Sequence, residues 1–175
     1  MMNYNNVSIQ LIEIPAIESE YYDSGLVNTA DVILVIVTSL SELESILSKL
    51  TKAPGKKLVV FNIKDETNER KLEDTLKSRK YDFVIISTKE EKGFEELKEK
   101  TLKGFGKIRV FTKEPVKEKS NRPLILSLDT DVKGVANKIL KDTSKIKETK
   151  IWGPSSKFPG QKVGLNHKLK DMDVI

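Results

Sequence analysis

The sequence contains no cysteine and a single histidine, His167. The absence of cysteine excludes disulfide bonds, thiolate metal sites and catalysis by a thiol, and a single histidine excludes any mechanism that needs two. No apolar run approaches the roughly 18 residues needed to span a membrane, and the first ten residues lack the basic and apolar segments of a secretion signal. We therefore expect a soluble cytoplasmic protein that does not associate with membranes.

The charged residues are unevenly distributed along the chain. Residues 1–106 contain 15 Lys and Arg against 18 Asp and Glu, a net charge of −3, whereas residues 107–175 contain 16 against 8, a net charge of +8. This asymmetry predicts two modules, of which the basic one can meet a polyanion. A solvated lysine-rich surface explains the charge equally well, and the Lys- and Glu-rich composition without cysteine also indicates a thermophile.

Residues 1–106 alternate apolar segments with amphipathic helical patterns, which indicates βα units and a parallel sheet. Ser39 begins a capping box for one of the helices, and a second helix is predicted over residues 67–80. We expect a four-stranded parallel α/β domain over residues 1–106. The predicted strands are Val7–Ile14, Asp31–Thr38, Lys57–Ile63 and Tyr81–Ser87.

From Lys107 the pattern changes to short strands and a single helix, which Asp131 can cap. We expect an α+β domain over residues 107–175, in which one helix packs on a mixed sheet. The predicted strands are Ile108–Thr112, Leu124–Leu128, Thr149–Trp152 and Asp173–Ile175.

The C-terminal segment carries a dense motif. Residues 151–175 read IWGPSSKFPGQKVGLNHKLKDMDVI, and the upstream residues 108–115 read IRVFTKEP. This sequence resembles the TGS domain of the developmentally regulated GTP-binding proteins, which are related to the Obg proteins. The resemblance covers residues 108–175 and implies a ubiquitin-like β-grasp fold. It also implies RNA or ribosomal partners, because TGS domains accompany enzymes and GTPases that work on tRNA or ribosomes.

Residues 1–106 resemble the later part of the GTPase domain of the same family. The segment IQLIEIPAI corresponds in position to the family's Mg²⁺-binding motif Asp-x-Pro-Gly, but it has Glu13 and Ala16 in place of Asp and Gly. VVFNIKDE stands at the guanine-reading motif Asn-Lys-x-Asp and keeps Asn62 and Asp65, while VIISTKEEKGFEELKEK brings Ser87 to the Ser-Ala segment. The resemblance implies Asn62, Asp65 and Ser87 as residual nucleotide-binding residues, and Glu13 as a degenerate Mg²⁺ position with no metal bound.

The sequence has no P-loop motif G-x-x-x-x-G-K-[ST]. This loop supplies the backbone cradle and the lysine that hold nucleotide phosphates, and phosphoryl transfer depends on that positioning. We therefore expect a truncated GTPase-like sheet with no GTPase activity, no catalytic residues and no resident cofactor. GTP and Mg²⁺ are expected only if binding is residual or if a separate chain supplies the missing half. Asp65 and Glu13 can equally be solvated carboxylates without a role.

Basic and aromatic residues gather near the C-terminus, where they can neutralise phosphates and stack on unpaired bases. Trp152 is favoured as a core residue, and His167 is expected to make a structural hydrogen bond. The predicted RNA- or partner-binding residues are Lys150, Lys157, Phe158, Lys162, His167 and Lys168.

Three functional classes are compatible with these patterns. The first is a non-catalytic module that binds RNA or ribosome-associated partners. The second is the C-terminal part of a split or degenerate GTPase with residual GTP binding. The third is a protein–protein adaptor that uses the β-grasp surface or the sheet edge. The exposed edge at Val7–Ile14 can pair with a partner protein or with a second copy of the chain.

Overall fold

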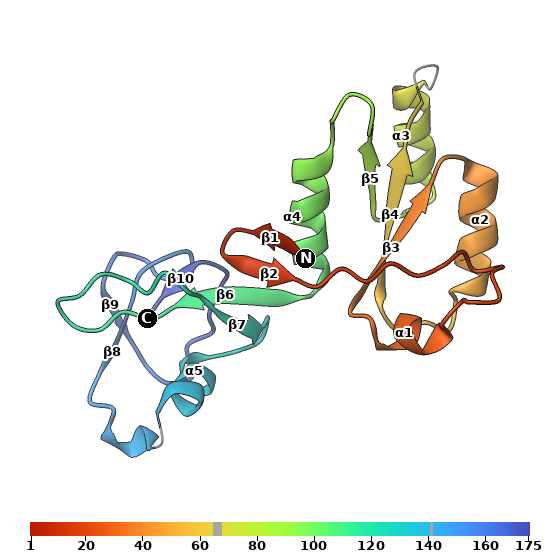
Figure 1. Cartoon of the computed structure of the whole chain (residues 1–175). Coiled ribbons are helices and arrows are strands. Elements are labelled where there is room, and N and C mark those ends of the chain that lie inside the picture. The colour runs from red at the N-terminus through yellow and green to blue at the C-terminus, as the bar shows by residue number, and fades with distance from the viewer. Residues whose placement is uncertain (65–67, 141) are drawn as a thin grey trace. The chain divides into compact units, whose positions relative to one another are not determined.

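The computed structural model describes residues 1–64, 68–140 and 142–175, and the chain divides into two compact units. The first unit comprises Met1–Tyr4 and Gln10–Phe105, and the second comprises Asn5–Ile9 and Gly106–Ile175. Figure 1 shows the helices and strands of both units along the chain. Among the described residues, no helix is both long enough and apolar enough to cross a membrane.

The first unit is built on a three-stranded parallel sheet with the strand order β3-β4-β5. The strands are β3 (Val32–Val37), β4 (Lys56–Asn62) and β5 (Phe83–Ile86). They connect through α2 (Leu40–Lys49) and α3 (Glu69–Ser78), with α1 (Ser24–Thr29) before β3 and α4 (Phe94–Gly104) after β5. This mixed α/β structure with a parallel sheet is compatible with a GTPase-like fold.

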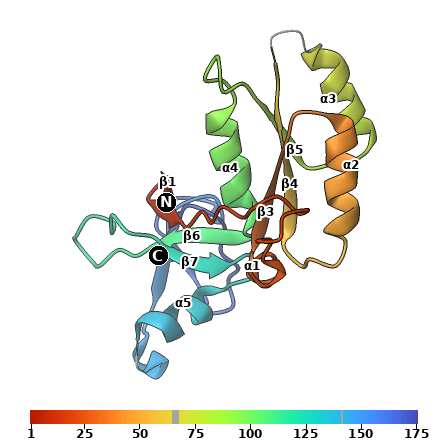
Figure 2. The same cartoon turned by 45° about the vertical axis from the view of Figure 1, so that its right-hand side comes forward.

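Helices cover both faces of the parallel sheet, as Figures 1 and 2 show. Because side chains alternate along a strand, each strand contributes to two apolar layers, which explains its nearly continuous apolar sequence. One layer joins β3 and β4 to α2 and α3 through Val35, Val37, Val59, Phe61, Leu43, Leu72 and Leu76. The other joins β4 and β5 to α4 through Leu58, Val60, Val84, Ile86, Phe94 and Leu97.

The N-cap predicted at Ser39 is confirmed, whereas the reciprocal bond of the predicted capping box is made to Thr38, one residue before the cap. The Ser39 hydroxyl accepts a hydrogen bond from the backbone N–H of Glu42 at 3.2 Å. The Glu42 carboxylate in turn accepts from the backbone N–H of Thr38 at 2.9 Å. The bond to Ser39 satisfies one of the donors that the first turn of α2 leaves without intrahelical partners, and the bond to Thr38 fixes the residue before the cap, so α2 begins where the sequence predicts.

The predicted strand Val7–Ile14 is wrong in both length and pairing. β2 covers only Val7–Ile9 and forms a two-stranded sheet with β1 (Met2–Tyr4), so it does not join the parallel sheet. Asn5 and Asn6 connect these strands with φ angles of +49° and +63°, as a two-residue hairpin turn requires. Residues 10–16 form neither strand nor helix, so the expected four-stranded sheet has three strands.

The second unit contains a mixed sheet in the order β10-β6-β7, on which α5 (Val132–Ile139) packs. β6 (Lys107–Phe111) runs antiparallel to β7 (Leu124–Ser127) and parallel to β10 (Asp173–Val174). β8 (Thr149–Ile151) and β9 (Gln161–Val163) form a separate antiparallel ribbon, preceded by the short η1 (Thr143–Lys145). The core consists of Ile108, Val110, Leu126, Val132, Val135, Ile151 and Leu169.

Side-chain hydrogen bonds fix the ends of several elements in this unit. Asp131 caps α5 by accepting from the backbone N–H of Gly134 at 2.9 Å, as predicted. Asp171 accepts from the backbone N–H of Arg109 at 2.7 Å and from its guanidinium at 3.0 and 2.5 Å. Burial by itself raises the pKa of Asp171, but these bonds to Arg109 outweigh it and hold the pKa below its ordinary value.

Candidate functional site

Two of the three predicted nucleotide-binding residues lie at the carboxyl ends of β4 and β5. Asn62 is the last residue of β4, and Ser87 directly follows β5. Parallel α/β sheets bind ligands outside the carboxyl ends of their strands, so this edge is where a nucleotide site is expected. The third predicted residue, Asp65, lies outside the described residues.

Thr88, rather than Ser87, contacts Asn62 at this edge. The Asn62 Oδ1 accepts from the backbone N–H of Thr88 at 3.2 Å, and the Asn62 Nδ2 donates to the Thr88 hydroxyl at 3.3 Å. The side chain of Ser87 is buried, and its hydroxyl accepts from the backbone N–H of Glu90 at 3.2 Å. Asn62 therefore holds the loop after β5 in place. Sequence reasoning missed Thr88 because its role depends on the pairing of β4 with β5.

The degenerate Mg²⁺ position, Glu13, lies in residues 10–16 with its side chain exposed. Within the described ranges, no group of three or more His, Cys, Asp or Glu side chains is placed to hold a metal ion. The donor set that a cation would need is therefore not assembled around Glu13 by the described residues.

The structure divides the predicted RNA- or partner-binding residues among three places. Lys150 on β8 and Lys162 on β9 lie directly opposite each other, and both bind Glu148, at 3.3 and 2.6 Å. Hydrogen bonds to Lys162 and then Lys150 lower the pKa of Glu148, and the bond to Glu148 raises the pKa of Lys162. The Glu148 carboxylate thus forms ion pairs with two ammonium groups on an exposed ribbon.

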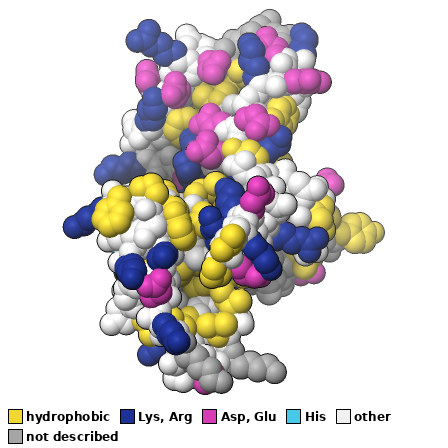
Figure 3. Space-filling model, turned by 90° about the vertical axis from the view of Figure 1, so that its left-hand side faces the viewer, with side chains coloured by type: hydrophobic (Ala, Val, Ile, Leu, Met, Phe, Trp, Pro, Cys, Tyr) yellow, Lys and Arg dark blue, Asp and Glu magenta, His cyan; other side chains and the backbone are white. Residues whose placement is uncertain are grey.

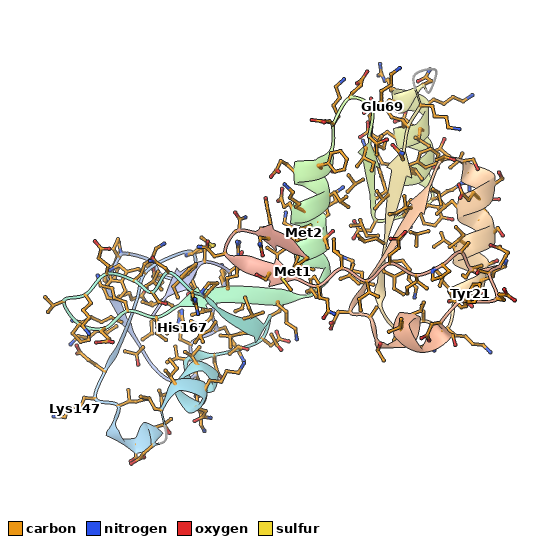
Figure 4. All side chains as sticks on the ribbon, in the orientation of Figure 1. Met1, Met2, Tyr21, Glu69, Lys147 and His167 are labelled. Carbon is orange, nitrogen blue, oxygen red and sulfur yellow. The ribbon has the colours of Figure 1, made fainter. Side chains whose placement is uncertain are left out.

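Lys168 and His167 occupy a second place, near the start of α5. The Lys168 Nζ donates to the backbone carbonyl of Asp129 at 2.7 Å and lies 3.7 Å from the Asp131 carboxylate. The His167 Nε2 forms a 3.0 Å hydrogen bond with the Ser155 hydroxyl, and Figure 4 shows His167 among the loops of the second unit. Among the described residues no carboxylate bonds to the other ring nitrogen, so this bond links two loops and does not complete a catalytic triad.

Lys157 and Phe158 occupy the turn between β8 and β9. The backbone N–H of Lys157 donates to the Gln161 Oε1 at 2.7 Å, which fixes the turn. The side chain of Phe158 is 60% exposed and presents an aromatic face to solvent. Earlier in the chain, between η1 and β8, Lys147 extends away from the ribbon, as Figure 4 shows.

The assignment of Trp152 to the core is wrong. Ile151 is fully buried in the core of the second unit, so alternation places its neighbours Lys150 and Trp152 on the outer side. Trp152 is half-buried and lines an open hollow of about 400 Å³. The other residues that line this hollow are Lys113, Glu118, Lys119 and Val174.

Two lysines at the hollow lie over aromatic rings. The Lys113 Nζ is 5.1 Å from the centroid of the Trp152 ring, and the Lys119 Nζ is 4.8 Å from that of Phe111. Sequence reasoning missed both lysines because they precede Trp152 by more than 30 residues and reach it only through the fold. Figure 3 shows one face of the molecule, on which Lys and Arg side chains lie among hydrophobic ones.

No family model matches the chain. Over 123 residues it is 33% identical to an uncharacterized GTP-binding protein of Methanocaldococcus jannaschii, covering 67% of this chain and 32% of that protein. It is 31% identical over 171 residues to one of Schizosaccharomyces pombe, covering 95% of this chain and 44% of that protein. The chain thus spans less than half the length of these relatives. These similarities and the parallel α/β sheet support a relationship to a family of GTP-binding proteins.

Proposed function

We propose that this chain is a GTPase-related protein of the DRG/Obg type without catalytic activity of its own. In this proposal the second unit is a β-grasp TGS domain that binds RNA, including RNA of the ribosome. The observation that carries the proposal is the outer face of the β8–β9 ribbon, where Lys150, Lys162 and Trp152 lie together. This face belongs to the part of the chain with a net charge of +8.

The charges on this ribbon favour a bound anion. Like charges directly opposite each other on two strands repel, and Lys150 opposes Lys162. Glu148 offsets only one of the two positive charges. A phosphate group at the ribbon would supply the second negative charge. Its neutralisation by the lysines would release counterions from the nucleic acid, so binding should weaken as salt increases.

Replacing Lys150 and Lys162 together by alanine should weaken binding of an RNA hairpin and flatten the dependence of affinity on salt by roughly two units, one for each lost phosphate contact. The matched control is Lys133→Ala with Lys138→Ala, which removes the same charge from the exposed side of α5. Glu148→Gln should strengthen binding, because it removes the competing carboxylate. Fluorescence anisotropy of the labelled hairpin across a salt series measures all three in the full chain.

The assignment of RNA binding to the outer face of the β8–β9 ribbon would be wrong if both double variants lost affinity equally, since binding would then follow net charge alone. It would also be wrong if the variant lacking Lys150 and Lys162 kept the wild-type salt dependence. In either case a protein–protein adaptor becomes the better proposal.

A second candidate function is residual recognition of a guanine base at the carboxyl edge of the parallel sheet. Its support is the hydrogen-bonded pair Asn62 and Thr88, together with the printed names of the relatives as GTP-binding proteins. The 175 residues contain no P-loop to hold phosphates. A base contact alone makes a weak site, because its few interactions must offset the loss of ligand freedom on binding.

Calorimetry should therefore give no sub-micromolar affinity for GTP, and GTP, GDP and guanosine should bind equally weakly because the phosphates contribute nothing. No GTP hydrolysis should be detected. Asn62→Ala should abolish whatever guanosine binding exists, whereas Thr88→Val, which removes only the hydroxyl partner, should retain part of it. Tight binding of GTP over guanosine, or turnover lost in Asn62→Ala, would contradict the non-catalytic proposal.

A further inference from the structure

We propose that the hollow beside Trp152 is a subsite for one unpaired nucleotide of a bound RNA, whose base stacks on the Trp152 ring. This inference rests on the proposed RNA-binding function and adds a specific contact to it. It makes the protein selective for single-stranded segments, because only an unpaired base can present its face to a side chain on the protein surface.

The Trp152 ring at the hollow is held through its backbone. Hydrogen bonds at 2.9 and 2.7 Å pair the backbone of Trp152 with Val174 on both sides, so the indole is attached to a rigid part of the sheet. Gly160 lies against one side of the ring, where an added Cβ would be only 3.5 Å from the Trp152 Nε1. The ring therefore contacts backbone at Gly160 and also lines the hollow.

The groups that line the hollow match an anionic, planar ligand. Lys113 and Lys119 each bring an ammonium group, and Glu118 brings the one opposing charge. Neither lysine forms an ion pair with a carboxylate among the described residues. The indole N–H likewise makes no hydrogen bond within the described part of the chain and is free to donate to a base. Aromatic faces beside cations are the common elements of sites for single-stranded nucleic acids.

The contact between Lys113 and Trp152 does not block such a ligand. A cation–π contact at an exposed site is weaker than base stacking, so a base can displace the ammonium from the ring. The displaced Lys113 then lies beside the phosphate of the same nucleotide. Lys150 and Lys162 lie on the same outer side of the β8–β9 ribbon as Trp152, so the RNA backbone can continue from the hollow onto these two lysines.

The test uses the full chain and its own fluorescence, because Trp152 is the only tryptophan. Titration with unstructured oligouridylate should quench this fluorescence to saturation, whereas the oligoadenylate–oligouridylate duplex should bind without comparable quenching.

Trp152→Ala should lower oligouridylate affinity about 10- to 100-fold, while Trp152→Phe retains most of it. Lys113→Ala with Lys119→Ala should flatten the salt dependence, with Lys133→Ala and Lys138→Ala as the matched control. Circular dichroism verifies that each variant is folded.

The proposed subsite is refuted if oligouridylate binds without quenching Trp152, a result that leaves the proposed RNA function intact. It is also refuted if the duplex quenches as strongly, or if polyglutamate quenches and oligouridylate does not, which would assign the hollow to an acidic peptide. If neither oligouridylate nor the RNA hairpin binds at all, the proposed function fails together with this inference. These readings on the wild-type chain do not depend on any variant folding.

Discussion

Replacing Leu43 by alanine should destabilise the first unit by about 2–5 kcal/mol, the range for a leucine removed from a well-packed core. Leu43 lies on α2, has no exposed surface and packs in the apolar layer with Val35 and Val37 of β3. The substitution removes the buried side chain and leaves a cavity, because neighbouring elements can relax only partly. Urea denaturation followed by far-ultraviolet circular dichroism measures the loss.

Leu11→Ala is the matched control, because it makes the same chemical change in the same unit. Leu11 is 49% exposed and lies outside regular secondary structure, so its substitution should change the free energy of unfolding by less than about 1 kcal/mol. Equal effects of the two substitutions would show that α2 does not pack on the sheet as the structure has it.

Replacing Asp173 by alanine should destabilise the second unit by about 2–4 kcal/mol, because it leaves backbone donors without a partner. The Asp173 side chain is fully buried and accepts from the backbone N–H of Ser155 at 3.0 Å and of Lys170 at 2.6 Å. It also lies against Gly153, so it holds the loop that follows Trp152. The fluorescence of Trp152 during urea denaturation reports on this unit directly.

Asp173→Asn should have a smaller effect, since one carbonyl oxygen of the amide can still accept a hydrogen bond. The control is Asp129→Ala, which removes an exposed carboxylate from the same unit and should leave the unfolding transition nearly unchanged. If Asp173→Ala unfolds at the same urea concentration as wild type, the buried carboxylate does not hold this loop, and the support proposed for the Trp152 hollow is lost.

Local patterns predicted the elements of the first unit closely. The expected strand Asp31–Thr38 corresponds to β3, Lys57–Ile63 to β4 and Tyr81–Ser87 to β5, with shifts of one or two residues at their ends. The helix predicted over residues 67–80 corresponds to α3. Each of these depends on apolar periodicity or a cap within a few residues, so the sequence nearby contains most of the information.

The segment Val7–Ile14 shows that the local sequence does not by itself predict which strands pair. Its apolar residues fit a strand, but a strand also needs a partner, and here the partner of β2 is β1 through the Asn5-Asn6 turn. Two adjacent asparagines, which tolerate positive φ angles, are the sequence signal for this hairpin. The resemblance to a GTPase domain instead favoured pairing within the parallel sheet.

By itself, the sequence determined the alternation of strands and helices, the caps at Ser39 and Asp131, the excess positive charge of residues 107–175 and the absence of a P-loop. These are properties of composition or of neighbouring residues. Only the tertiary structure decided that Trp152 faces outward beside Lys113, that Thr88 meets Asn62 and that Ser155 meets His167. The physical reason is that strand alternation places successive side chains on opposite sides, but strand pairing and packing decide which side is buried and which distant residues meet there.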